Sequence, residues 1–162
     1  MEVVGIDHLY VTVSDFGRAE DFYDRVMAFL GFRKGDKRIA GEPHAHYFNR
    51  VLQYTIRPAK RAAPHDPYAP GLHHLCFQVP DRAAVDAAHR FLRAAGIEAT
   101  EPRVYPEYND DYYATFFPDP DGLRLEIVAR SRYRKEVAAR WEEMRVFLNP
   151  MAELLARAPE KT

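Results

Sequence analysis

The sequence predicts an α+β fold of two βαβββ modules, whose curved mixed sheets form a cleft, followed by a C-terminal helical extension. The main reason is an internal repeat. Residues 5–13 read Gly-Ile-Asp-His-Leu-Tyr-Val-Thr-Val, and residues 71–79 read Gly-Leu-His-His-Leu-Cys-Phe-Gln-Val. A helical pattern and then three strand-like segments follow each copy. Because a repeated pattern indicates a repeated supersecondary unit, we expect both halves to fold alike.

The helix of each module is predicted from its start, its periodicity and its end. Asp15 and Asp81 occupy the position of an N-cap, whose side chain accepts a backbone N–H of the first turn. Apolar residues then recur at helical spacing in both copies. Gly31 and Gly96 stand where each helix should end, because glycine readily adopts the left-handed conformation found there.

Three strand-like segments follow each helix. In the first copy they cover residues 32–34, 45–48 and 51–57, and in the second copy residues 98–104, 112–117 and 123–129. The last two segments of the second copy are separated by Pro-Asp-Pro-Asp-Gly at 118–122, which is a strong turn sequence.

These elements divide the chain into one domain at residues 1–130 and a helical extension at 131–162. Within the domain, module one covers 1–58, a linker rich in proline and alanine covers 59–70, and module two covers 71–130. The extension carries an apolar stripe at three- to four-residue steps: Val137, Trp141, Met144, Leu148, Met151 and Leu155. Pro150 is a candidate bend, and the stripe should pack on the body or on a partner chain.

Composition limits the classes of function. Of 162 residues, 47% are hydrophobic and 29% are charged, which is typical of a soluble globular protein. No apolar run approaches the ~18 residues of a membrane span, and no signal-peptide pattern opens the sequence. The net charge of −1 argues against nucleic-acid binding. The single cysteine excludes an intrachain disulfide, and we expect a cytoplasmic protein.

Strand alternation places the repeated histidines on polar faces. His8 and His74 lie opposite the apolar residues of their strands, and Glu126 lies opposite the apolar residues of the last strand. The position equivalent to Glu126 in module one is Gln53. If the two sheets curve around a cleft, these four side chains converge there.

Two imidazoles and one carboxylate suit a first-row divalent ion and leave coordination positions open for substrate or water. A structural zinc site would instead be closed by four protein ligands, often thiolates, which this chain cannot supply. The sequence therefore predicts a metal site of His8, His74 and Glu126. Gln53 is either a fourth ligand or a residue that hydrogen-bonds the substrate.

Other polar residues are candidates for catalysis or substrate binding. The candidate catalytic residues are Glu126, Tyr113 and His46. The alternative for His46 is an exposed histidine in a loop. The candidate substrate-binding residues are Tyr10, Thr12, Gln53, Tyr105 and Arg124. Residues 105–113 are unusually rich in tyrosine and acid. They form either a lid from which Tyr105 or Tyr113 donates to substrate, or a surface loop whose tyrosines pack on the body.

These motifs resemble the vicinal oxygen chelate superfamily, which includes glyoxalase I, extradiol dioxygenases, fosfomycin-resistance enzymes and bleomycin-resistance proteins. The resemblance covers residues 4 to about 129, through Gly-Ile-Asp-His8-Leu, Gly-Leu-His-His74-Leu and Asp119-Pro-Asp-Gly-Leu-Arg-Leu-Glu126. It implies that His8, His74 and Glu126 bind the metal. Glyoxalase I-like members commonly have a glutamate where this chain has Gln53, so the triad is closer to the dioxygenase and fosfomycin-resistance patterns.

The resemblance also implies a function. We expect an enzyme that uses one divalent metal ion (Fe, Mn, Zn or Ni) to bind vicinal oxygens of a small-molecule substrate. Its reaction would be that of a lyase or isomerase, a dioxygenase or a thiol transferase. The resemblance implies a homodimer with His8 from one chain and His74 and Glu126 from the other, and an intrachain site is the alternative. The other candidate function is a non-catalytic protein that sequesters a ligand or antibiotic, as bleomycin-resistance proteins do.

Overall fold

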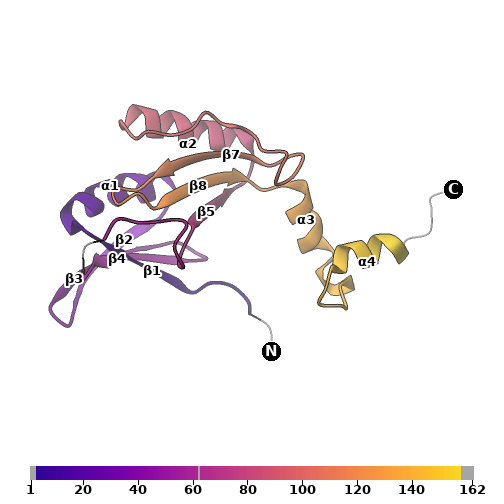
Figure 1. The fold of residues 1–162 in the computed structure, drawn as a ribbon, viewed down its shortest axis with the longest axis horizontal. Coiled ribbons are helices and arrows are strands. Elements are labelled where there is room, and N and C mark those ends of the chain that lie inside the picture. The colour runs from indigo at the N-terminus through magenta and orange to yellow at the C-terminus, as the bar shows by residue number, and fades with distance from the viewer. Residues whose placement is uncertain (1–2, 62, 158–162) are drawn as a thin grey trace.

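The computed structural model describes residues 3–61 and 63–157. Module one forms a four-stranded sheet with the strand order β1-β4-β3-β2 (Figure 1). Its elements are β1 (His8–Val13), α1 (Phe16–Phe29), β2 (Arg33–Ile39), β3 (Glu42–Phe48) and β4 (Gln53–Pro58). β1 pairs with β4 in parallel, and the other pairs are antiparallel.

Module two repeats this arrangement in a second sheet, with the order β5-β8-β7-β6. Its elements are β5 (His74–Val79), α2 (Arg82–Ala94), β6 (Arg103–Val104), β7 (Tyr113–Pro118) and β8 (Arg124–Ala129). β5 pairs with β8 in parallel, as β1 pairs with β4. The predicted fold of two βαβββ modules with mixed sheets is therefore confirmed.

The helices begin and end where the sequence indicates. The side chain of Asp15 accepts the backbone N–H of Arg18 at 3.0 Å, and Asp81 accepts that of Ala84 at 2.9 Å. Both contacts satisfy an N–H that the first helical turn leaves without a partner. Gly31 follows α1 with a φ of 82°, a backbone angle that residues with a Cβ rarely adopt.

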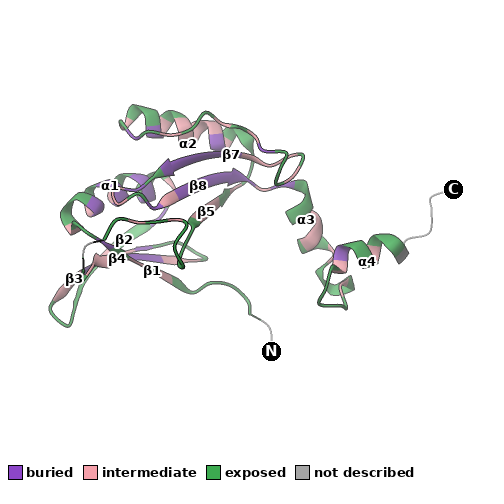
Figure 2. Cartoon of the chain, in the orientation of Figure 1, coloured by how far each residue is buried: buried purple, intermediate pink, exposed green. Residues whose placement is uncertain are grey.

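The two modules share one hydrophobic core. The apolar faces of both sheets and both helices contribute to it, and the rings of Tyr54 in β4 and Phe77 in β5 lie 6.3 Å apart. Phe29 of α1 and Phe91 of α2 stack at 4.2 Å. In Figure 2 the buried colour runs along β7 and β8. Because both sheets turn their apolar faces toward this core, their polar faces point away from it.

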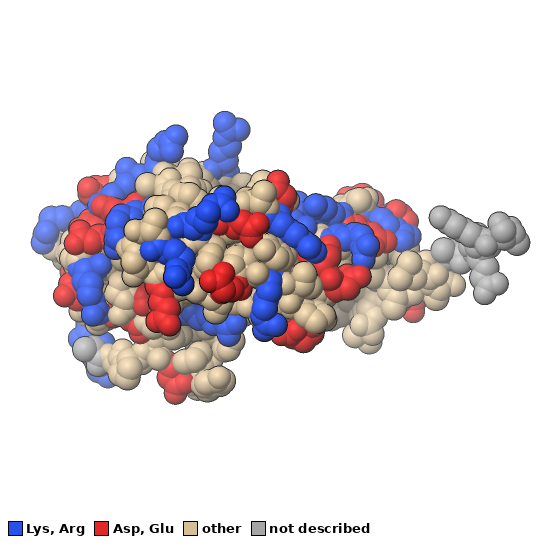
Figure 3. Space-filling view, turned by 90° about the horizontal axis from the view of Figure 1, so that it is seen from above, with Lys and Arg blue, Asp and Glu red and all other residues tan. Residues whose placement is uncertain are grey.

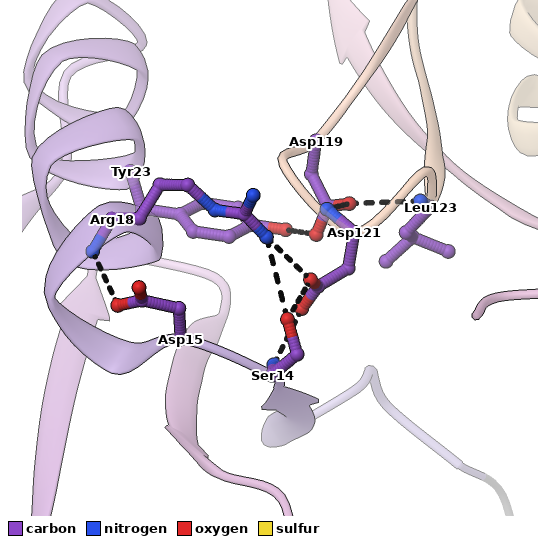
Figure 4. A network of polar contacts seen from close by, with 7 residues as sticks. All are labelled: Ser14, Asp15, Arg18, Tyr23, Asp119, Asp121 and Leu123. Atoms are coloured by element: carbon purple, nitrogen blue, oxygen red, sulfur yellow. Dashed lines mark hydrogen bonds and ion pairs between the residues drawn. The ribbon is translucent and has the colours of Figure 1, made fainter. Parts of the chain in front are cut away.

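A buried polar network joins the two modules (Figure 4). The carboxylate of Asp119, in the turn between β7 and β8, accepts the hydroxyl of Tyr23 in α1 at 2.8 Å. It also accepts the backbone N–H groups of Asp121 at 2.9 Å and Leu123 at 2.8 Å. Burial raises the pKa of Asp119, and these three hydrogen bonds oppose that rise. Beside it, Asp121 accepts the backbone N–H of Ser14 at 2.7 Å.

The C-terminal extension projects from the body rather than packing along it (Figure 1). It consists of α3 (Arg132–Ala139), a 3-10 turn at Trp141–Glu143 and α4 (Pro150–Arg157). Pro150 is the first residue of α4, so it begins a helix rather than bending one. Of the predicted stripe, Met151 is buried, whereas Leu148 and Leu155 are 74% and 59% exposed.

Basic and acidic side chains are interspersed over the face of the molecule seen from above (Figure 3). This mixture accords with a net charge of −1. Within the part of the chain that the structure describes, no helix is long and apolar enough to cross a membrane.

Candidate functional site

Glu126 and His74 meet on the polar face of module two. Both project from neighbouring parallel strands, β8 and β5, in which Glu126 is paired with Cys76. His74 Nε2 lies 3.4 Å from Glu126 Oε2. The side chain of Glu126 is only 1% exposed, although it lies on the face away from the main core. A carboxylate removed from water in this way requires a compensating partner.

Tyr112 supplies part of that compensation. Its hydroxyl donates to Glu126 Oε1 at 2.6 Å. Tyr112 ends the loop at residues 105–112, which we call the tyrosine loop, and its ring packs on Tyr108 at 5.1 Å. Burial, together with the hydrogen bond to Glu126, raises the pKa of Tyr112 above its ordinary value. The hydroxyl therefore stays protonated and remains a donor at neutral pH.

Cys76, the residue paired with Glu126, lies close to the Tyr112 hydroxyl. Its Sγ is 4.0 Å from the Tyr112 hydroxyl oxygen. Burial, followed by the charge of Glu126, raises the pKa of the Cys76 thiol. The thiol is consequently protonated at neutral pH and is a poor nucleophile or metal ligand.

The polar face of module one carries the other predicted ligand positions. His8 in β1 is paired with Gln53 in β4, so the two residues are neighbours. His8 Nδ1 contacts Asp7 Oδ2 at 2.8 Å, which leaves Nε2 as the nitrogen for coordination. The ring of Tyr10 packs edge-on against His8 at 5.5 Å. His8 and Tyr10 are both exposed.

Gln53 and His46 form a small polar cluster around Thr55. Gln53 Nε2 lies 3.1 Å from Thr55 Oγ1 and 3.3 Å from His46 Nδ1. His46 Nδ1 also contacts Thr55 Oγ1, at 2.8 Å. Burial, and then the charges of His44 and Lys37, lower the pKa of His46. The neutral imidazole, which can accept a proton, is therefore favoured at neutral pH.

A single chain presents the predicted ligands as two pairs. His8 and Gln53 lie on the sheet of module one, and His74 and Glu126 lie on the sheet of module two. Among the residues that the structure describes, no three His, Cys, Asp or Glu side chains come together so that they could hold a metal ion. We call the two pairs the His8 half-site and the Glu126 half-site.

The remaining predicted residues lie in different surroundings. Tyr113 donates its hydroxyl to Asp86 of α2 at 2.7 Å, so it faces the helix and is not brought to Glu126. The structure places the adjacent Tyr112 there instead, and sequence reasoning missed it. The available signals were the segment's high tyrosine content and the predicted strand at 112–117, whose alternation puts Tyr112 and Tyr113 on opposite faces. Tyr105 is buried against Phe116, with ring centroids 5.1 Å apart.

Arg124 lies two residues before Glu126 in β8, whereas Tyr10 and Thr12 lie in β1 of module one. The guanidinium of Arg124 stacks over the ring of Phe116 at 4.0 Å. Tyr10 and Thr12 line a cavity of about 430 Å³ between β1, the linker and the turn that contains Asp119. Thr12 itself is exposed.

Comparison with known proteins identifies the family. The model of the Glyoxalase/Bleomycin resistance protein/Dioxygenase superfamily matches residues 5–127. The uncharacterized protein YaeR of Escherichia coli (strain K12) is 30% identical over 132 residues, which cover 75% of this chain and 93% of YaeR. The family model ends at residue 127, before α3 and α4.

Solved structures show the same fold. A glyoxylase/bleomycin resistance protein/dioxygenase domain from Frankia sp. EAN1pec matches with a TM-score of 0.68 and 22% identity, covering 80% of this chain and 100% of that domain. The fosfomycin resistance protein FosX of Listeria monocytogenes, as a mutant complexed with Mn(II) and dihydroxypropylphosphonic acid, matches with a TM-score of 0.63 and 16% identity. That match covers 83% of this chain and 98% of FosX. The chain belongs to the Glyoxalase/Bleomycin resistance protein/Dioxygenase superfamily.

Proposed function

We propose that the chain is a divalent-metal-dependent enzyme that binds two neighbouring oxygens of a small substrate. One observation carries the proposal. The buried carboxylate of Glu126 lies 3.4 Å from His74 Nε2, and the two residues belong to paired neighbouring strands. A nearly unexposed carboxylate beside an imidazole nitrogen is suited to share a cation.

The residues fit a first-row divalent ion. With His8, the donor set comprises two imidazole nitrogens and one carboxylate, which suits Fe, Mn, Ni or Zn. A bound ion would supply Lewis acidity toward two neighbouring substrate oxygens. FosX supports this chemistry, because its crystals held Mn(II) together with a compound that bears neighbouring hydroxyl groups.

The surrounding side chains orient the donors and provide a proton acceptor. His74 is held through its Nδ1, which lies 2.7 Å from His73 Nδ1, so that Nε2 faces Glu126. Gln53 is a poor proton acceptor. We therefore assign proton transfer to His46, whose lowered pKa favours the neutral ring and which lies beside Gln53. Gln53 then binds the substrate or serves as a fourth ligand.

We propose further that the working site is shared between two copies of the chain. The His8 half-site of one copy would complete the Glu126 half-site of the other. β1 and β5, which carry His8 and His74, each stand at one end of their sheet's strand order. An edge strand exposes backbone hydrogen-bonding groups that a second copy can cover. This arrangement gives a homodimer with two equivalent sites.

Metal titration tests the proposed function. Metal-free protein should bind about one Mn²⁺, Ni²⁺, Zn²⁺ or anaerobic Fe²⁺ ion per chain in isothermal titration calorimetry. His74→Ala should weaken that binding by roughly 100-fold or more, because it removes a ligand. His89→Ala is the matched control. His89 lies on α2 near Glu101, and its loss should leave the affinity unchanged.

Circular dichroism of each variant shows whether the fold is retained. If the wild-type chain binds none of these ions, the proposed enzyme is wrong. The non-catalytic, ligand-sequestering function would then be the better explanation.

A further inference from the structure

We propose that Tyr112 is a positioning residue that occupies one oxygen of Glu126 and leaves the other for the metal ion. This inference rests on the proposed function. The Tyr112 hydroxyl donates to Oε1 at 2.6 Å, whereas Oε2 is the oxygen that lies 3.4 Å from His74 Nε2. The two oxygens of one carboxylate thus have different partners, and only Oε2 faces the imidazole.

The packing around Glu126 keeps these roles fixed. Glu126 lies in β8 between β5 and β7, where it is paired with Cys76 on one side and Phe116 on the other. The side chain is 1% exposed. Because these neighbours leave so little room, exchanging the two oxygens would require the surrounding side chains to move.

The tyrosine loop holds the Tyr112 hydroxyl in place. The backbone N–H of Tyr105 donates to the carbonyl of Tyr112 at 2.8 Å, and the N–H of Tyr112 donates to the carbonyl of Asn109 at 3.1 Å. The Tyr112 ring packs edge-on against Tyr108, and Tyr108 stacks on Tyr105 at 6.2 Å. The donor is therefore set in position before any ion arrives, and little conformational freedom is lost on binding.

Coordination through one oxygen has a functional consequence. A substrate that chelates through two neighbouring oxygens needs two adjacent open positions on the ion. A carboxylate that binds through both oxygens would occupy one of these positions. By holding Oε1, Tyr112 keeps Glu126 as a single-oxygen ligand and preserves space for the substrate. Hydrogen bonds of this kind to a ligating carboxylate typically change metal affinity by about 10- to 100-fold.

Comparison of Tyr112→Phe with Tyr108→Phe tests the inference. The first variant removes the hydroxyl that contacts Glu126 and keeps the ring. The second removes a hydroxyl from the neighbouring ring, which is 59% exposed, and also keeps the ring. Each full-length variant is titrated with Mn²⁺ by calorimetry, and its Co²⁺ complex is measured by visible absorption, which reports coordination geometry.

Tyr112→Phe should weaken Mn²⁺ binding by about 10-fold and change the Co²⁺ spectrum, because Oε1 becomes free to coordinate. Tyr108→Phe should match the wild type in both measurements. If the wild type binds Mn²⁺ but Tyr112→Phe has the same affinity and spectrum, the role of Tyr112 is overturned and the proposed function stands. If the wild type binds no metal, both are overturned.

Discussion

Two buried carboxylates in module two have opposite surroundings. Asp119 accepts one hydroxyl and two backbone N–H groups, so its hydrogen-bonding capacity is largely used within the chain. Glu126 is still less exposed, accepts the Tyr112 hydroxyl and lies beside an imidazole. A carboxylate whose lone pairs are used by backbone and buried hydroxyl donors stabilises a fold, whereas a buried carboxylate beside an imidazole is suited to share a cation. We therefore regard Asp119 as structural, in contrast to the metal-binding role that we propose for Glu126.

Asp119→Ala should lower the free energy of unfolding by about 2–4 kcal/mol, because it leaves three donors without their acceptor. One of them is the hydroxyl of Tyr23, a fully buried residue whose hydroxyl also accepts that of Tyr54 at 2.8 Å. Urea denaturation followed by circular dichroism measures the loss. Tyr23→Phe, which removes one donor and leaves the carboxylate, should cost less. Equal stability of Asp119→Ala and the wild type would contradict the structural role.

At the scale of elements, the C-terminal extension is connected to the tyrosine loop. α3 directly follows β8, the strand that carries Glu126. The backbone N–H of Arg132, at the start of α3, donates to Asp111 Oδ2 at 2.5 Å. The Arg132 guanidinium also pairs with Asp110 at 2.7 Å, but both side chains of that ion pair are at least 70% exposed. An exposed pair contributes little, so the Asp111 contact should hold the loop.

We expect Asp111→Ala to accelerate amide hydrogen exchange in residues 105–112, since the loop would lose its contact with the first turn of α3. Asp110→Ala removes only the exposed ion pair and should leave exchange close to that of the wild type. Hydrogen–deuterium exchange with mass spectrometry resolves this segment. Equal exchange rates in the two variants would mean that Asp111 does not fix the loop.

The elements that the sequence predicted well are those with local signals. These signals are the repeated Gly-x-x-His-Leu pattern, the capping residues Asp15 and Asp81 and the turn at Asp119. Each of them acts on residues only a few positions away, so each module could be recognised without knowing the fold. Tyr112 lies just before β7 begins at Tyr113. The predicted strand at 112–117 included Tyr112, and alternation places Tyr112 and Tyr113 on opposite faces. The sequence did not show which of these faces lies beside Glu126, so it did not choose between the two tyrosines.

The C-terminal extension shows the same limit. Its three- to four-residue spacing correctly indicated helix, but it did not show that residues 140–149 separate two short helices. Asn149 adopts a φ of 50° directly before α4, which a continuous helix does not permit.

At the scale of the whole molecule, the shared core determines how the two half-sites relate. Each polar face points away from the core that Tyr54 and Phe77 help to form, so residues equivalent by repeat lie on separate sheets. The sequence placed the four half-site residues on polar faces of their strands, but it left open whether one chain brings them together. The homodimer that we propose, in which each site takes one half from each copy, would bring the two half-sites together, and it makes a prediction that an intrachain site does not.

Mixed dimers of two inactive variants provide that test. His8→Ala and Glu126→Ala chains should each fail to bind Mn²⁺ as homodimers, because every site lacks a ligand. In a mixed dimer with shared sites, one site carries both substitutions, and the other combines His8 from one chain with His74 and Glu126 from its partner. Dimers isolated through two different affinity tags should therefore bind about one Mn²⁺ per dimer with nearly wild-type affinity. If the sites were intrachain, every site in the mixed dimer would lack either His8 or Glu126. A mixed dimer without measurable Mn²⁺ binding would therefore exclude the shared site.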